Sequence, residues 1–431
     1  MVNPLLDLKK IYIERRATLL NTVKSLHSEK KQGTIILFAD FEREQEIFTQ
    51  ESSFYYMTGV TEPGSVLVMN WDGKSTLYVP NTGGTRQQWI EGALDTSAES
   101  IEDAGVDAIE YLGDKIKGYE LAPFFSESDY KNIIELLENN TKGGSTIFSL
   151  NPSTQNGYVV QRHILERLNS FVPALKEAIY DISSILADMR SRKSNEEIDL
   201  LYNAIDITSM GHEAAAKMIA PNRSESEVHA TVEYVFTAAQ AQLAFPSIVG
   251  SGKNSTVLHY TANNQPLEKD SLVVVDCGAR FYHYCADLTR TYPVSGKFTL
   301  RQKELYQLVL DCQAYIAEIA KPGMWLNNKD KPEESLNHLA REFFKKKDLD
   351  QYFVHGIGHY LGLDTHDVGD YSKPLEEGNV ITIEPGLYLP QENIGIRIED
   401  NYWIVKSGAV CLSEALPKSV DQIENLTKET F

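Results

Sequence analysis

Short apolar runs alternate with polar, helix-like stretches over the first 170 residues of the chain. The runs have the length and the Ile, Leu and Val content of strands, and they lie at 34–40, 65–71, 75–80 and 145–151. Asp72-Gly73, between two of these runs, is a residue pair that favours a hairpin turn. The pattern predicts an α/β domain, to which we assign residues 1–172.

A helical period begins near residue 176. Two segments have the capping-box form with which helices begin, Ser194 to Glu197 and Ser224 to Glu227. Strand-like runs return after residue 250, with one helix expected near 300–320; the runs lie at 271–278, 281–294, 380–389 and 395–405. Residues 173–431 are therefore predicted to form a second domain, of the α+β class.

The charge balance excludes some classes of partner. The chain has 61 acidic and 41 basic side chains and a net charge of −20, whereas nucleic acid and anionic membranes are bound by basic surfaces. No apolar run approaches the roughly 18 residues of a membrane-spanning helix, and the first residues lack the features of a secretory signal. Four cysteines without a CxxC pair indicate a reducing compartment. We expect a cytoplasmic protein that binds neither nucleic acid nor membrane.

Asp276 and Asp287 stand inside otherwise apolar and aromatic runs, where carboxylates are rare and costly to bury unpaired. A tight turn from Arg280 to His283 would make them direct neighbours on two antiparallel strands, with Cα atoms about 4.5–5.5 Å apart. Two like charges at that distance repel unless a cation lies between them. The alternative is a pair of solvated hairpin carboxylates.

Glu384 and Glu399 form a second pair of the same kind. A turn centred on Gln391-Glu392, in a segment with suitable turn residues, would place them opposite each other. Two hairpins that each present facing acids favour a metal site over solvated carboxylates.

Histidines supply candidate nitrogen ligands. Three of them crowd into one segment and a fourth follows a glycine-rich stretch: His355, His359, His366 and His259. Gly356 and Gly358 disfavour a helix there, and the absence of HExxH excludes a thermolysin-type zinc site. Their spacing does not say which of the three binds metal. Four carboxylates balance two divalent ions and favour Mn²⁺-like hard metals, and such a pair hydrolyses amides or esters.

Together these motifs resemble the pita-bread metallopeptidases, which include aminopeptidase P, prolidase and methionine aminopeptidase. The matching segments occur in family order: HYT (259–261), VDCGARFYHYCADLTRTYPV (275–294), HGIGHYLGLDTHDVG (355–369), TIEPGLY (382–388) and GIRIED (395–400). ESSFYYMTGVTEPGSVLVM (51–69) resembles the N-terminal domain of the creatinase and aminopeptidase P type. The resemblance implies a catalytic pita-bread domain, in which helices flank a curved antiparallel sheet.

The resemblance also implies five ligands for two divalent ions: Asp276, Asp287, His359, Glu384 and Glu399. Asp287 and Glu399 would bridge the ions, with Asp276 on one and His359 and Glu384 on the other. Glu384 would act as general base toward the bridging water. The expected ion is Mn²⁺, with Co²⁺, Zn²⁺ and Fe²⁺ as alternatives.

Residues around the metals have implied roles as well. His259 and His366 would steady the substrate carbonyl and the oxyanion, and His355 would line the same pocket. Arg397, on the same strand face as Glu399, would orient the metal-bound acids. Tyr388 would line the cleft, or be an ordinary strand tyrosine.

The family implies hydrolysis of Xaa-Pro bonds, either at the N-terminus of peptides with proline second or in dipeptides alone. Many prolidases carry an arginine-containing insertion between their equivalents of His366 and Glu384. Here that stretch is short and Lys373 is its only fixed cation, which favours the aminopeptidase. A non-catalytic binding module is a further alternative, against which the complete ligand set counts.

The resemblance extends to the assembly. Trp89, in TRQQWIEG (85–92), resembles a residue that reaches the cleft of a neighbouring subunit, with a core or surface tryptophan as the alternative. The expected assembly is a homodimer or a homotetramer.

Overall fold

The computed structural model describes residues 8–43, 46–84, 86–89, 94–116, 126–152 and 158–427. The chain divides into two units, of which the first ends at Met189 and the second begins at Arg190. The domain boundary at 172 that we expect from the sequence remains a prediction.

A six-stranded mixed sheet forms the centre of the first unit, in the order β4-β3-β2-β1-β5-β6. Its strands are β1 (Gly33–Phe38), β2 (Val66–Asn70), β3 (Ser75–Val79), β4 (Ala108–Tyr111), β5 (Thr146–Ser149) and β6 (Ile179–Asp181). The β2–β3 hairpin turns at Asp72-Gly73, as predicted, and Gly73 has a φ of 100°, which favours glycine. β1 pairs antiparallel with β2 and parallel with β5.

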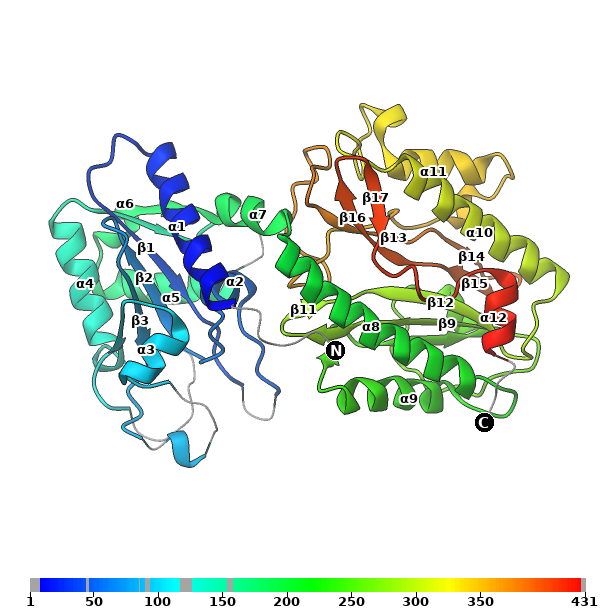
Figure 1. Ribbon diagram of the computed structural model, residues 1–431, viewed down its shortest axis with the longest axis horizontal. Helices are drawn as coiled ribbons and strands as arrows, with labels where there is room; N and C mark the ends of the chain where they lie inside the picture. Colours follow the sequence, from blue (N-terminus) through cyan, green and yellow to red (C-terminus); the bar gives the residue numbers. More distant parts are fainter. Residues whose placement is uncertain are drawn as a thin grey trace. The chain divides into compact units, whose positions relative to one another are not determined.

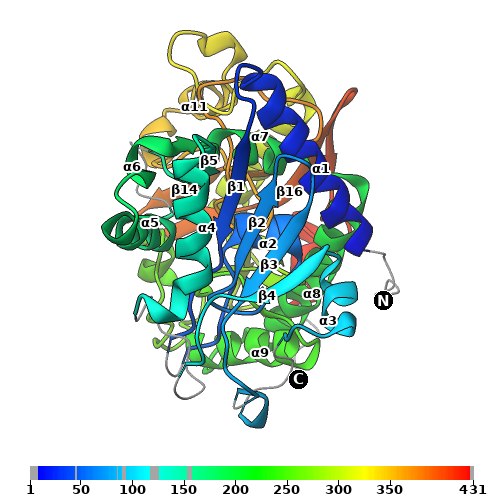
Figure 2. The same ribbon diagram turned by 90° about the vertical axis from the view of Figure 1, so that its left-hand side faces the viewer.

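Helices cover both faces of this sheet. They are α1 (Leu8–Leu26), α2 (Ser52–Thr58), α3 (Ala98–Ala104), α4 (Lys131–Lys142), α5 (Val159–Phe171) and α6 (Leu175–Ala178), with short 3₁₀ turns η1 (Arg86–Gln88) and η2 (Ser128–Tyr130). Alternate side chains of a strand point to opposite faces, so Ile36 and Phe38 of β1 pack against Leu137 of α4 and Leu168 of α5. The helix α1 lies on the opposite side of the sheet (Figure 1, Figure 2). The α/β class predicted for this part of the chain is confirmed.

Antiparallel strands form the centre of the second unit. They are β7 (Gln242–Leu243), β8 (Ile248–Ser251), β9 (Leu272–Cys277), β10 (Ala279–Phe281), β11 (Tyr284–Cys285), β12 (Leu288–Pro293), β13 (Val380–Ile383), β14 (Gly386–Leu389), β15 (Ile394–Arg397), β16 (Asp400–Val405) and β17 (Gly408–Cys411). They pair as β12-β9-β8, β13-β16-β17, β14-β15 and β11-β10-β7. A bridge between Thr289 of β12 and Glu399, which lies between β15 and β16, links the first of these groups to the segment that connects the third group to the second.

Helices flank these strands, as predicted. They are α7 (Ser183–Ser191, which crosses from the first unit), α8 (Asn195–Met218), α9 (Glu225–Ala238), α10 (Leu300–Ile319), α11 (Leu336–Lys345) and α12 (Val420–Leu426), with η3 (Gly252–Thr256), η4 (Pro332–Glu334) and η5 (Asp350–Tyr352). The two predicted capping boxes begin α8 and α9. In Figure 1 the strands lie between α8 and α9 (green) and α10 and α11 (yellow), and Val232, Val275 and Val309 belong to one apolar core. Among the described helices, none is both long enough and apolar enough to span a membrane.

Candidate metal centre

Asp276 and Asp287 lie on the ribbon formed by β9 to β12, but not in the predicted register. Asp276 pairs with Thr289, two residues beyond Asp287, so the direct pairing of the two acids is wrong. The two-residue turn between β10 and β11 consists of Tyr282 and His283, which both have positive φ, and it lies one residue later than predicted. Moving the turn by one residue moves the strand partner of Asp276 by two, from Asp287 to Thr289. Because side chains alternate with a period of two, both acids stay on one face as diagonal neighbours.

Glu384 and Glu399 occupy opposite positions on the second ribbon, in the predicted register. The pairs on either side of them keep the same alignment: Ile383 with Asp400, and Gly386 with Arg397. The turn between β14 and β15 is therefore centred on Gln391-Glu392, as expected.

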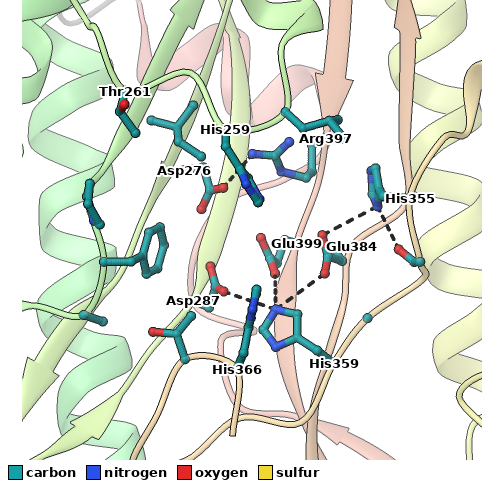
Figure 3. A pocket seen from close by; sticks show the side chains of 18 of the residues that line it. His259, Thr261, Asp276, Asp287, His355, His359, His366, Glu384, Arg397 and Glu399 are labelled. Atoms are coloured by element: carbon teal, nitrogen blue, oxygen red, sulfur yellow. Dashed lines mark hydrogen bonds and ion pairs between the residues drawn. The ribbon is translucent and has the colours of Figure 1, made fainter. Parts of the chain in front are cut away.

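Thr289 brings the two ribbons together. The Glu399 N–H donates to the Thr289 carbonyl oxygen over 3.1 Å, and the Thr289 hydroxyl donates to Glu399 Oε2 over 2.7 Å. Thr289 is also the strand partner of Asp276. The four carboxylates therefore converge on one place, as Figure 3 shows.

His359 supplies a nitrogen at the same place, from a segment that is not helical. A Cβ at Gly358 would lie 2.0 Å from the Thr382 carbonyl oxygen, so glycine is required for this close approach. His359 Nδ1 donates to the Tyr360 carbonyl oxygen over 3.0 Å, so in the neutral ring Nε2 is the nitrogen that can bind a cation. Nε2 lies 3.4 Å from Asp287 Oδ2 and 3.5 Å from Glu384 Oε1.

These residues fit a cation by their charge and by their unmet hydrogen bonds. Burial, followed by the charges of Asp276 and Glu384, raises the pKa of Asp287 well above its usual range. Burial and the charge of Asp287 do the same to the pKa of Glu399. Three buried carboxylate oxygens accept no hydrogen bond from the described residues: Asp276 Oδ1, Asp287 Oδ1 and Glu399 Oε1. Ligand atoms of Asp287, His359 and Glu399 lie within 4.8 Å of one another. Hard oxygen donors with one imidazole suit a divalent ion.

Arg397 supports the centre from behind. Its guanidinium donates to Asp276 Oδ2 over 2.5 Å, to the Thr289 hydroxyl over 3.1 Å and to the Tyr388 hydroxyl over 2.8 Å. The Tyr388 hydroxyl in turn lies 2.9 Å from His355 Nε2. Because His355 Nδ1 donates to the Gly356 carbonyl oxygen over 2.7 Å, Nε2 accepts from Tyr388. Tyr388 is buried behind the pocket wall, which differs from the cleft-lining position that we expect for it.

A pocket of about 660 Å³ opens over the five candidate ligands. Arg397 and three of the singled-out histidines, His259, His355 and His366, also line it. The His366 ring lies 4.3 Å from the His359 ring between centroids. Burial lowers the pKa of His366, and the neighbouring His359 adds to this effect. The structure thus brings nine of the eleven singled-out residues to one pocket; Tyr388 lies behind it.

The eleventh residue is Trp89, which lies in the first unit just after η1. Its side chain is 65% exposed, so it is a surface tryptophan rather than a core one. The role that the resemblance implies for it stays a prediction.

The apolar side of the pocket is not among the features that the sequence predicts. This side, the apolar wall, consists of Phe245, Pro246, Ile248 and Leu258. Nothing in the sequence distinguishes these residues from core residues, since their place depends on the path of β8 and of the loops on both sides of it.

Such a group of acids and one imidazole in the lining of a pocket is typical of metal-dependent hydrolases. Two family models match the chain: "Aminopeptidase P, N-terminal domain" over residues 12–119 and "Metallopeptidase family M24" over residues 199–406. The Xaa-Pro aminopeptidase of Escherichia coli is 32% identical over 413 residues, which are 88% of this chain and 89% of that protein. The chain belongs to metallopeptidase family M24, and its second unit has the pita-bread fold of that family.

Two further relatives match a shorter part of the chain. The Xaa-Pro aminopeptidase of Haemophilus influenzae is 39% identical over 272 residues, and the match covers 58% of this chain and 63% of that protein, less than two thirds of its length. The Xaa-Pro dipeptidase of Pyrococcus furiosus is 38% identical over 238 residues, 54% of this chain and 66% of that protein. Among solved structures, aminopeptidase P of Escherichia coli with the inhibitor Pro-Leu has a TM-score of 0.80 and 28% identity, and the match covers 97% of this chain and 98% of that chain.

Proposed function

We propose that this protein is an aminopeptidase that removes the first residue from peptides whose second residue is proline. The convergence of four carboxylates and one imidazole in a single pocket carries this proposal. The relative from Escherichia coli, which aligns along most of the chain and is named an Xaa-Pro aminopeptidase, supports the substrate class.

Asp276, Asp287, His359, Glu384 and Glu399 would hold two divalent ions. When bound, the ions polarise the scissile carbonyl and lower the pKa of a water. The proposed ion is Mn²⁺, because carboxylate oxygens dominate the donor set, with Co²⁺, Zn²⁺ and Fe²⁺ as alternatives. Elemental analysis of the purified protein, followed by reconstitution with each ion, tests this choice.

Glu384 is the proposed general base. Its Oε1 lies 3.5 Å from His359 Nε2 and accepts from the Thr382 hydroxyl over 3.3 Å. Its Oε2 lies on the other side, 3.8 Å from His355 Nδ1. Oε2 would therefore take the proton of the attacking water and return it to the leaving nitrogen of proline.

The histidines on the substrate side would act as hydrogen-bond donors. His259 and His366 would donate to the carbonyl oxygen as it gains negative charge, and His355 would line the pocket beside Glu384. An Xaa-Pro bond lacks an N–H, so recognition would rest on the carbonyl and on contact between the proline ring and the apolar wall. Arg397 would hold Asp276 in place.

Cleavage of longer peptides is expected to exceed cleavage of dipeptides. A dipeptidase must bind the free carboxylate of its substrate, for which arginine is the usual partner. Among the described residues that line the pocket, Arg397 is the one Lys or Arg, and its guanidinium already donates to Asp276, Thr289 and Tyr388. With Mn²⁺ added, we expect kcat/KM for Xaa-Pro-Yaa to exceed that for the matching Xaa-Pro by about tenfold or more. A tenfold ratio corresponds to a cost of about 1.4 kcal/mol for leaving the carboxylate of the dipeptide unpaired in the pocket.

The second candidate is an Xaa-Pro dipeptidase, which the relative from Pyrococcus furiosus supports. Cleavage of Xaa-Pro alone, with no cleavage of the tripeptide, would decide for this candidate. Peptides with alanine in place of proline serve as the control for specificity.

We also propose a homodimer or homotetramer in which Trp89 reaches the pocket of a neighbouring subunit. The exposure of this large apolar side chain supports the proposal. Trp89→Ala is then expected to lower kcat/KM by about tenfold, for the loss of about 1.4 kcal/mol of contact. Mixing and reassembling Trp89→Ala with inactive Asp287→Ala subunits should restore activity, because hybrid assemblies pair an intact metal centre with an intact Trp89.

A mixture of Asp287→Ala with Glu399→Ala is the control, since both changes affect the same centre and no hybrid is intact. Trp89 acts elsewhere if the first mixture is no more active than Trp89→Ala alone.

A cytoplasmic location completes the proposal. All four cysteines are free thiols, three of them buried, as suits a reducing compartment. Fractionation of cells that express the protein, followed by detection with an antibody, tests it.

A further inference from the structure

The loop that carries His259 is fastened to the start of a helix. This segment, the His259 loop, runs from Ser251 at the end of β8 to Gln265 and includes η3. His259 and Thr261, which lie near the middle of this loop, line the pocket. His259 itself is exposed, so its own side chain does not fix its position.

Glu225, the first residue of α9, is the centre of the attachment. Its side chain is fully buried. Oε1 accepts from the Ser251 N–H over 2.8 Å, from the Ser251 hydroxyl over 2.8 Å and from the Asn254 side-chain amide over 3.1 Å. Oε2 accepts from the Tyr260 hydroxyl over 2.8 Å and from the Gln265 N–H over 2.9 Å. One carboxylate therefore contacts the loop at both ends and at the residue next to His259.

Further contacts restrict the loop in the same place. The Glu225 N–H donates to the Gln265 carbonyl oxygen over 2.9 Å, and the Ser226 hydroxyl donates to the Asn263 carbonyl oxygen over 2.7 Å. On the far side, the Gly395 N–H of β15 donates to the Ser255 hydroxyl over 2.8 Å. The loop is thus held between α9 and the strand that carries Arg397.

We infer that Glu225 is a positioning residue, which fixes the His259 loop so that His259 points at the substrate carbonyl. The role of His259 toward the substrate carbonyl rests on the proposed function, whereas the attachment of the loop to Glu225 does not. All five donors to Glu225 are neutral, and an ionised carboxylate accepts at both oxygens without donating. Its position in the first turn of α9 adds the favourable field of the helix dipole. A glutamine would direct an amide N–H₂ at donors on one side.

A double-mutant cycle tests the inference. Glu225→Gln and, separately, Tyr260→Phe are combined with His259→Ala. In the otherwise unchanged protein, each is expected to lower kcat for an Xaa-Pro peptide by about tenfold or more, since a misplaced catalytic group can cost up to about a hundredfold. In the His259→Ala background the same changes should lower kcat by less than about twofold, because the group that they position is gone. Metal content should not change.

Equal losses in both backgrounds, or loss of bound metal, would overturn the inference. Glu227→Gln is the matched control: Glu227 lies two residues further along α9 and accepts from Ser224 in the capping box rather than from the loop. If Glu225→Gln fails to fold, Tyr260→Phe decides alone, because it removes one hydroxyl and keeps the ring.

Amide hydrogen exchange separates this inference from the proposed function. Exchange in peptides that cover 251–265 is expected to rise by about tenfold or more in Glu225→Gln, and not in Glu227→Gln. This measurement needs no activity, so a wild-type protein that cleaves no Xaa-Pro peptide would refute the function and leave the attachment testable. Unchanged exchange in 251–265 would refute the attachment itself.

Discussion

Asp287→Ala is expected to abolish both metal binding and turnover. Asp287 Oδ2 lies 3.4 Å from His359 Nε2, and ligand atoms of these two residues and Glu399 lie within 4.8 Å of one another, so the change removes a carboxylate from the proposed metal site. Bound metal contributes several kcal/mol to the stabilisation of a hydrolytic transition state, so kcat should fall by about a thousandfold or more. Elemental analysis and a peptide assay on the same preparation measure both effects.

A second variant at this position, Asp287→Asn, should compare differently with wild type in stability when metal is absent and when it is present. Stripped of metal by a chelator, Asp287→Asn should melt no lower than wild type, because one of several repelling carboxylates has become neutral. With metal at about 100 to 1,000 times its dissociation constant, wild type should gain about 2.7–4.1 kcal/mol, and the variant nothing. The exposed Glu304→Gln serves as the control. A variant that keeps its metal and its activity would refute the metal mechanism.

Arg397→Ala is expected to cost about 3–5 kcal/mol of the free energy of unfolding, since it leaves Asp276 buried without its partner. The guanidinium is nearly inaccessible and donates to Asp276, Thr289 and Tyr388, all of which lose a donor together. Urea unfolding of the chelated protein measures the loss without any contribution from metal. Affinity for metal should fall as well, because Asp276 is no longer held in place.

Arg301→Ala is the matched control for this prediction. Arg301 pairs with Glu392 and Glu304 on the surface, where an ion pair contributes about 1 kcal/mol or less. Equal losses from Arg397→Ala and Arg301→Ala would mean that Arg397 does not support the centre in the way proposed here.

The sequence predicts the strands and the convergence of the acids well, because both depend on local patterns. The register of the second ribbon follows from its turn residues, and the capping boxes of α8 and α9 follow from side chains three residues apart. The first ribbon shows the limit of this reasoning. Its turn could be centred on either of two adjacent positions, and the backbone of Tyr282 and His283 decided between them.

Features that depend on distant parts of the chain could not be predicted in this way. The spacing of the three clustered histidines does not say which one faces the carboxylates, since that depends on how Gly358 packs against Thr382. Tyr388 takes its place from Arg397 and His355, and Glu225 takes its importance from a loop that begins 26 residues later. Such contacts follow only from the tertiary structure.

The strand pairs β13–β16 and β14–β15, on either side of Glu384 and Glu399, keep one register. This limits how the segment between the two acids can change in length. Deleting one residue between Gly386 and Arg397 would turn one of the two acids to the opposite face of the ribbon, whereas deleting a matched pair from its two strands would preserve the facing arrangement. Natural variation in this turn, and any engineering of it, should therefore proceed in steps of two residues.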